Sequence, residues 1–186
     1  MLLRNRIPKI ETAPAEAAKP YRHLDDKAIA VLGWLAANRV DFVLVGPVAR
    51  AIRGERRARG PVSIVPAPYG RNLDRLVRAL HSAHARVRTD ADPKHDSADH
   101  VKLTADKLVG PTRWMLRCGL HELDVEGRPK GVPRYQELLY EASRFELAPQ
   151  LRVEVASPED VEHYEHVRIT GTSPEIHVFK NSVKQG

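Results

Sequence analysis

The sequence predicts a single α/β or α+β domain with a mixed sheet flanked by helices. First, 186 residues leave room for one hydrophobic core of ordinary size. Second, segments with apolar residues three or four positions apart alternate with short apolar runs bounded by glycine and proline. Third, this alternation is not strictly regular and shows no internal repeat, which favours a mixed sheet over a purely parallel one.

Composition restricts the compartment and the partners. The chain carries 30 Lys and Arg against 24 Asp and Glu, and the formal net charge of +6 favours anionic partners such as nucleotides or nucleic acid. The single cysteine excludes an intramolecular disulfide and a multi-cysteine zinc site. No apolar run approaches the roughly 20 residues that span a bilayer, and no apolar stretch follows Arg4 and Arg6. We therefore expect a cytoplasmic protein without a membrane partner.

The N-terminal part divides into an arm and a helix. Residues 1–22 contain three prolines and no hydrophobic period, which predicts a flexible basic arm. A folded domain is expected at 23–168. Its first element is a helix that starts after Asp25, a typical N-cap, and runs to about Asn38 with its apolar residues on one side.

The next segment combines two strands and a short helix. The apolar run 41–46 ends in a glycine, which predicts a buried strand that leads into a tight turn. Pro47 suits the first turn of a helix over 47–52, because its missing N–H would be unpaired there. A basic loop at 53–60 follows, and the alternation at 61–65 predicts the second strand.

Shorter elements are expected in the second half of the chain. Asn72 is a candidate N-cap for a helix that ends near Ala85, and the polar stretch 86–99 predicts an exposed loop. A C-terminal extension is expected at 169–186. The remaining expectations are strands at 100–104, 113–117, 122–125, 151–155 and 175–179, and helices at 134–145 and after Ser157.

The order of these motifs resembles the nucleotidyltransferase superfamily, in particular its small bacterial members of the minimal and abortive-infection toxin type. The resemblance rests on Phe42-Val-Leu-Val-Gly46 followed by a short helix, on the basic loop and strand that end at Val65, and on His121-Glu-Leu-Asp124-Val-Glu. It spans roughly residues 25–165. It implies a nucleotidyltransferase-like fold and a nucleotide cleft bordered by the basic loop.

The resemblance also implies where catalysis would take place. Nucleotidyl transfer uses two divalent cations that are held by carboxylates on adjacent strands. In this chain Pro61 and Ser63 stand at two of the three carboxylate positions, and Asp124 is the one that remains. Proline offers no side-chain ligand and a neutral hydroxyl is a weak one. We therefore predict a pseudoenzyme without a metal cofactor. The alternative is an active, toxin-like nucleotidyltransferase that modifies RNA or protein with Mg²⁺, in which Asp124 is catalytic.

A polar loop could supply replacement metal ligands for that alternative. Asp90 and Asp92 copy the Asp-x-Asp spacing, although the residues around them do not form an apolar strand. A solvated surface loop is therefore the favoured interpretation of residues 89–100. The candidate ligands in this loop are Asp90, Asp92, His95, Asp96, Asp99 and His100.

Arginines gather between the first two predicted strands, next to the glycine turn. Guanidinium groups match phosphate oxygens in pairs, so this segment predicts binding to the phosphates of a nucleotide or an RNA. A solubilising surface is the alternative, and a protein partner is a third role for the fold. The candidate phosphate-binding residues are Gly46, Arg50, Arg53, Arg56, Arg57 and Arg59.

Overall fold

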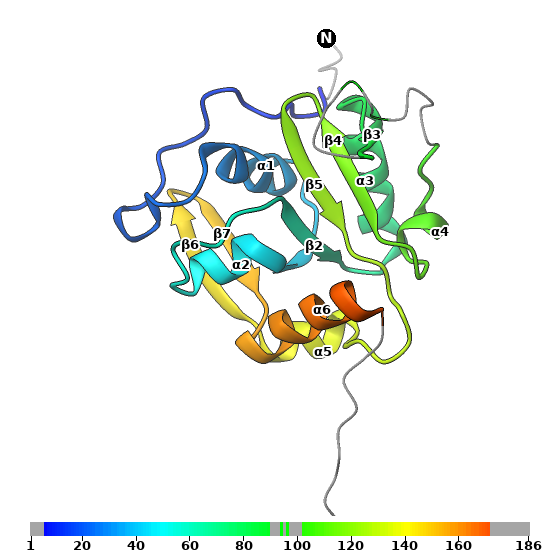
Figure 1. The fold of residues 1–186 in the computed structure, drawn as a ribbon. Helices are drawn as coiled ribbons and strands as arrows, with labels where there is room; N and C mark the ends of the chain where they lie inside the picture. The colour runs from blue at the N-terminus through cyan, green and yellow to red at the C-terminus, as the bar shows by residue number, and fades with distance from the viewer. Residues whose placement is uncertain (1–5, 90–93, 95, 97–101, 172–186) are drawn as a thin grey trace, which may run out of the picture.

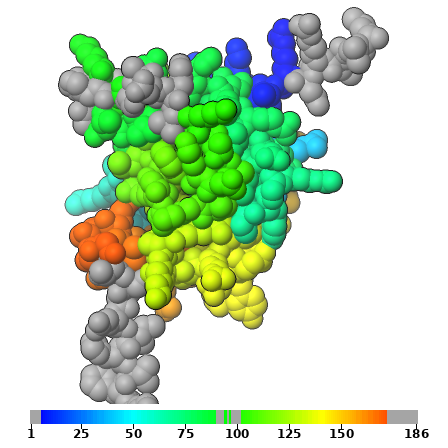
Figure 2. Space-filling view, turned by 90° about the vertical axis from the view of Figure 1, so that its right-hand side faces the viewer, coloured from blue at the N-terminus to red at the C-terminus, as the bar shows by residue number. Residues whose placement is uncertain are grey.

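The computed structural model describes residues 6–89, 94, 96 and 102–171. Seven strands form one mixed sheet in the order β3-β4-β5-β2-β1-β7-β6, and helices cover both of its faces (Figure 1). The α/β class with a mixed sheet in a single domain is as predicted. From the side, α6 (Pro158–Thr170, orange) and α3 (Gly70–Ser82, blue-green) lie on opposite sides of the green part of the chain that contains α4 and β4 (Figure 2).

The elements follow one another as strands and short helices. The strands are β1 (Phe42–Val45), β2 (Val62–Pro66), β3 (Arg86–Val87), β4 (Trp114–Cys118), β5 (His121–Val125), β6 (Ser143–Ala148) and β7 (Leu151–Val155). The helices are α1 (Asp26–Ala37), α2 (Gly46–Ile52), α3 (Gly70–Ser82), α4 (Ala105–Leu108), α5 (Tyr135–Glu141) and α6 (Pro158–Thr170), and a short 3-10 helix, η1, spans Lys19–Tyr21.

The middle of the sheet brings together strands that are distant in sequence. β1 pairs antiparallel with β2 and parallel with β7, while β2 pairs parallel with β5. Every residue of β1 and β2 is buried, which explains why β1 is a continuous apolar run, and in β2 the polar Ser63 of the alternating pattern is buried as well. The parallel register sets Ser63 directly beside Asp124.

Both acidic and hydroxyl N-caps behave as their sequence predicts. The Asp25 carboxylate accepts a hydrogen bond from the Lys27 N–H at the start of α1. The Ser157 hydroxyl accepts one from the Asp160 N–H at 3.2 Å, with proline in the first turn of α6. Apart from these caps, the predicted bounds of the first two helices and of five strands agree with the structure to within one or two residues.

Asn72 does not cap α3, contrary to the prediction. The helix begins at Gly70, and the buried amide of Asn72 lies in its first turn. Its Oδ1 accepts a hydrogen bond from the Asp41 N–H at 2.7 Å, and its Nδ2 donates to the carbonyls of Asp41 and Ala67. Asn72 thus joins the start of β1 to the end of β2, a role that depends on residues far away in sequence.

The helix predicted at 134–145 is too long. Helix α5 ends at Glu141, and Phe145 lies in β6, opposite Val153 of β7. Pairing with β7 supplies backbone hydrogen bonds that outweigh the helical pattern of the sequence. Tyr21 packs edge-on against the Phe145 ring, with 6.4 Å between the ring centroids.

Two expectations between 86 and 104 are also corrected. The predicted loop begins with the two-residue strand β3, which pairs with β4, and its Asp96 is buried rather than solvated. Residues 100 and 101 of the strand expected at 100–104 lie outside the described residues, and residues 102–104 are not a strand. Thr104 instead caps α4. The strand expected at 175–179 also lies outside the described residues.

The N-terminal segment contacts the core from residue 8 onward. The Trp34 indole N–H donates to the Pro8 carbonyl at 3.1 Å, and the Ala18 N–H donates to the Leu147 carbonyl at 2.7 Å. The segment therefore lies along α1 and β6 (Figure 1). Within the described part of the chain, every helix is too short or too polar to cross a membrane.

Candidate functional site

The glycine turn and two strands meet at one point of the sheet. Ser63 lies between Val45 of β1 and Asp124 of β5 in the pairing register. A Cβ placed on Gly46 would lie 2.8 Å from the Ser63 hydroxyl, and Gly46 has φ +72°, so both space and backbone conformation require glycine. The structure thus brings Gly46, Ser63 and Asp124 together at a site closed to solvent.

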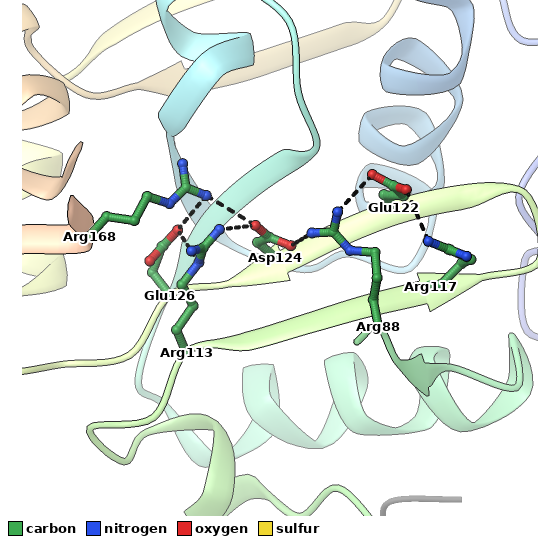
Figure 3. Close-up of polar contacts among 7 residues, drawn as sticks. All are labelled: Arg88, Arg113, Arg117, Glu122, Asp124, Glu126 and Arg168. Atoms are coloured by element: carbon green, nitrogen blue, oxygen red, sulfur yellow. Dashed lines mark hydrogen bonds and ion pairs between the residues drawn. The ribbon is translucent and has the colours of Figure 1, made fainter. Parts of the chain in front are cut away.

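Three arginines surround the carboxylate of Asp124, which is fully buried. Arg88 donates to Oδ1 at 2.8 Å, while Arg113 and Arg168 both donate to Oδ2, the latter at 3.1 Å (Figure 3). These side chains come from the residue after β3, from the residue before β4 and from α6. Both carboxylate oxygens are therefore occupied by guanidinium groups of the chain itself.

The contacts continue on both sides of Asp124 with alternating charge. Glu126 pairs with Arg113 at 3.3 Å and with Arg168 at 3.7 Å. On the other side Glu122 pairs with Arg88 at 3.0 Å and with Arg117 at 3.4 Å, and Arg117 pairs with Asp96 at 3.1 Å. We call these residues the ion-pair network: Arg88, Asp96, Arg113, Arg117, Glu122, Asp124, Glu126 and Arg168, of which all but Asp96 are drawn in Figure 3.

The charges of the ion-pair network balance. Four arginines face four carboxylates, so the network is formally neutral. Burial raises the pKa of Glu126, and the charges of Arg113 and Arg168 act in the opposite direction. Because such charges leave water only when they are paired, the geometry of the site depends on each partner being present.

Two of the predicted phosphate-binding arginines have partners inside the protein. Arg50 pairs with Glu55 and with Glu165 of α6, and its hydrogen bond to Glu55 raises its pKa. Arg53 donates to the carbonyls of Ala156 and Val155 at 2.7 and 3.1 Å, and burial lowers its pKa. Arg50 and Arg53 therefore join α2 to α6 and β7.

The other three arginines lie on the exposed loop after α2. Arg56, Arg57 and Arg59 are all exposed. Arg59 donates to the Arg56 carbonyl at 2.6 Å, which keeps the loop compact. The structure thus divides the predicted set: Gly46 at the buried turn, two arginines with internal partners, and three that face solvent.

A cavity of about 300 Å³ borders this loop. Its lining comes from the start of α1, from α2 and from the beginnings of β2 and β5. Lys27 and Arg59 contribute positive charge to it, Asp25 and Glu122 contribute negative charge, and Pro61 forms part of the wall. The cavity therefore lies between Arg59 of the exposed loop and Glu122 at the edge of the ion-pair network.

Of the candidate metal ligands in the loop 89–100, the structure describes Asp96 alone. Asp96 pairs with Arg117, whereas Asp90, Asp92, His95, Asp99 and His100 lie outside the described residues. Among the residues that are described, no three His, Cys, Asp or Glu side chains gather as a metal site would require.

Sequence reasoning missed the arginines around Asp124. A partial signal exists, because Glu122, Asp124 and Glu126 alternate along β5 and so face the same side. Arg113, just before the antiparallel neighbour β4, and Arg117 within β4 are four residues apart and so also face one side. Arg88 and Arg168 carry no local signal, since β3 and α6 reach the site only through the tertiary fold.

No known family or curated relative could be identified for this chain. Neither the family models nor the curated proteins that were searched include a match to this chain.

Proposed function

We propose that this chain is a nucleotidyltransferase-fold protein that does not transfer nucleotides and that binds the phosphate groups of a nucleotide or an RNA. Binding takes place at the exposed loop formed by Arg56, Arg57 and Arg59. The protein acts by binding, and its former catalytic centre serves to hold the fold together.

The occupied carboxylate of Asp124 carries the proposal. A divalent cation at this position needs the Asp124 oxygens as ligands, yet guanidinium groups of Arg88, Arg113 and Arg168 bond to both of them. Each guanidinium group carries a positive charge, so the three arginines compete with a metal cation for the carboxylate oxygens. Asp124 therefore serves as an anchor for three arginines.

The remaining positions do not fit a pair of magnesium ions either. Ser63 is neutral and fully buried, and among the described residues its hydroxyl has no hydrogen-bond partner. Pro61 has no side-chain ligand atom. Mg²⁺ requires hard oxygen ligands in near-octahedral arrangement, and this donor set lacks them. No step of a metal-dependent reaction follows from these residues.

The exposed loop supports the binding half of the proposal. Arg56, Arg57 and Arg59 place three cations within four residues, opposed in the loop by Glu55, which already pairs with Arg50. Arginine forks bind phosphate oxygens through paired hydrogen bonds. The adjoining cavity has room for part of a nucleotide beside the loop.

Labelled nucleoside triphosphates test the loss of catalysis. We expect no label on RNA or protein when the purified protein is incubated with each triphosphate, Mg²⁺ or Mn²⁺ and total RNA. The reason is that three guanidinium groups occupy the Asp124 oxygens that a metal ion would need as ligands. Label transfer by the wild type that is lost in Asp124→Asn, with the variant shown to be folded by circular dichroism, would instead establish the active, toxin-like alternative.

RNA affinity across salt concentrations tests the phosphate-binding loop. With three phosphate contacts we expect a slope of log K against log salt of about −2 for a single strand. Changing Arg56, Arg57 and Arg59 to Gln should weaken binding at least tenfold and flatten the slope. Fluorescence anisotropy of a labelled oligonucleotide measures both, and ATP in parallel separates nucleotide from RNA.

A matched variant removes the same charge elsewhere. Arg71, Arg78 and Arg86 are exposed and lie on α3 and β3, away from the loop. Their replacement by Gln should leave most of the affinity in place. Equal losses in both triple variants would show that net charge alone attracts the RNA, and absence of any binding would leave a protein partner as the role of the fold.

A further inference from the structure

A second cavity, of about 410 Å³, lies apart from the ion-pair network. Residues from the end of α1, from α5 and from β1, β6 and β7 line it, and no member of the ion-pair network is among them. We call this cavity the α1–α5 groove. Its volume is within the range of small-molecule sites in proteins.

The floor of the α1–α5 groove is apolar. Leu32 of α1, Phe42 of β1, Leu139 of α5 and Val153 of β7 line it from four different elements. These side chains already belong to the core or pack against it, so the floor is held in place without a ligand. A rigid apolar floor favours an apolar group of matching size, because little conformational entropy is lost on binding.

The rim of the groove carries one positive charge in excess. Its arginines are Arg39, Arg144 and Arg152, and its carboxylates are Asp41 and Glu154. Three positive and two negative charges leave +1.

Pairing isolates the excess charge on one residue. Glu154 pairs with Arg144 at 2.6 Å, Asp41 with Arg75 at 3.5 Å and Arg152 with Glu146 at 3.5 Å. Within residues 6–89, 94, 96 and 102–171, the Arg39 guanidinium has no ion-pair partner. Arg39 therefore supplies the cation that a ligand would neutralise.

Arg39 also has a backbone conformation that disfavours arginine. Its φ is +56°, in the left-handed region where glycine is the usual residue after a helix. The Arg39 N–H donates to the Ala36 carbonyl and the Val40 N–H to the Leu35 carbonyl, which ends α1. Nothing in this turn requires a side chain at residue 39. Strain of this kind at the mouth of a cavity points to a role for the side chain.

We propose that the α1–α5 groove binds a small amphipathic monocarboxylate, with its apolar body on the floor and its carboxylate paired with Arg39. A single negative charge matches the excess of +1 on the rim. A dianion would bring one negative charge more than the rim neutralises, and Asp41 and Glu154 would repel it. Burial, followed by these two carboxylates and Tyr69, raises the pKa of Tyr135 to about 12, so Tyr135, which also lines the groove, remains protonated.

Binding of 3-phenylpropionate tests the proposal. We expect calorimetry to show binding that is at least tenfold stronger than for the neutral 3-phenylpropionamide and for the dianion phenylsuccinate. Arg39→Gly should weaken 3-phenylpropionate binding at least tenfold while raising the melting temperature, because glycine relieves the strain at φ +56°. If Arg39 had only a structural role, Arg39→Gly would not weaken binding while raising the melting temperature.

Gln150→Gly is the matched control. Gln150 has φ +63° in the turn between β6 and β7 and does not line the groove, so this change should raise the melting temperature without altering binding. Ala36→Phe, at an exposed position of the groove wall, should block binding by filling the space. The proposal is overturned if the wild type does not bind 3-phenylpropionate up to about 10 mM, if the amide or the dianion binds equally well, or if Arg39→Gly retains the affinity.

Discussion

Asp124→Ala is expected to lower the free energy of unfolding by about 3–5 kcal/mol, because it leaves three guanidinium groups without their shared anion at a buried site. Arg88, Arg113 and Arg168 have side chains only 16, 27 and 20% exposed, so water cannot fully replace the carboxylate. Urea unfolding followed by circular dichroism measures the change.

Two further variants separate the charge from the volume of Asp124. Asp124→Asn keeps the shape and removes the charge, and it should retain most of the destabilisation. Adding Arg168→Ala to Asp124→Ala removes one of the unpaired cations and should recover part of the loss. Glu16→Ala breaks the exposed pair with Arg22 and should change stability by no more than about 0.5 kcal/mol. A loss below about 1 kcal/mol in Asp124→Ala would contradict the role of Asp124 as an anchor.

Gly127→Ala is expected to destabilise the protein by about 3 kcal/mol, since the new methyl group would collide with backbone. A Cβ on Gly127 would lie 2.6 Å from the Pro111 carbonyl carbon and 2.7 Å from the Thr112 carbonyl carbon, and both belong to the segment that leads into β4. The backbone cannot rotate away as a side chain would. Thermal unfolding measures the effect.

Gly33→Ala provides the opposite case. Gly33 lies in the middle of α1, and a Cβ there would meet nothing within 4 Å among the described residues. Alanine should therefore stabilise the protein by up to about 1 kcal/mol, the difference in helix propensity. If both glycine variants are destabilised alike, the close approach of residues 111 and 127 is not the cause.

Elements with strong local patterns were predictable from sequence. Helix α1 and strands β1 and β2 carry caps, apolar runs and a terminating glycine within a few residues of one another. The prediction fails where pairing with a segment distant in sequence determines the secondary structure. Phe145 belongs to a strand because β7 lies beside it, although Phe145 and Leu147 alternate with Arg144 and Glu146 and so carried a strand signal.

The strand that leads into Gly46 and the strands that carry Ser63 and Asp124 were predictable from sequence, whereas the partners of these residues were not. Strand pairing and the glycine turn place the three residues side by side. The arginines that bond to Asp124 were missed since they come from the residue after β3, from the residue before β4 and from α6. Sequence reasoning also grouped Arg50 and Arg53 with the exposed loop, whereas their guanidinium groups bond to Glu165 and to the Ala156 carbonyl.

The alternating charges across β5 have a consequence for how this sequence changes over generations. Glu122, Asp124 and Glu126 each pair with two or three arginines, and Asp96 pairs with Arg117 at one end of the ion-pair network. The effect of one substitution therefore depends on which neighbours are still present. Losing Glu122 alone removes one of two carboxylate partners from both Arg88 and Arg117, whereas losing it after both arginines have been replaced removes a partner from neither. Mutations at these eight positions are therefore epistatic. Drift toward an apolar site, or back toward a metal-binding one, has to proceed through coordinated replacements rather than single steps.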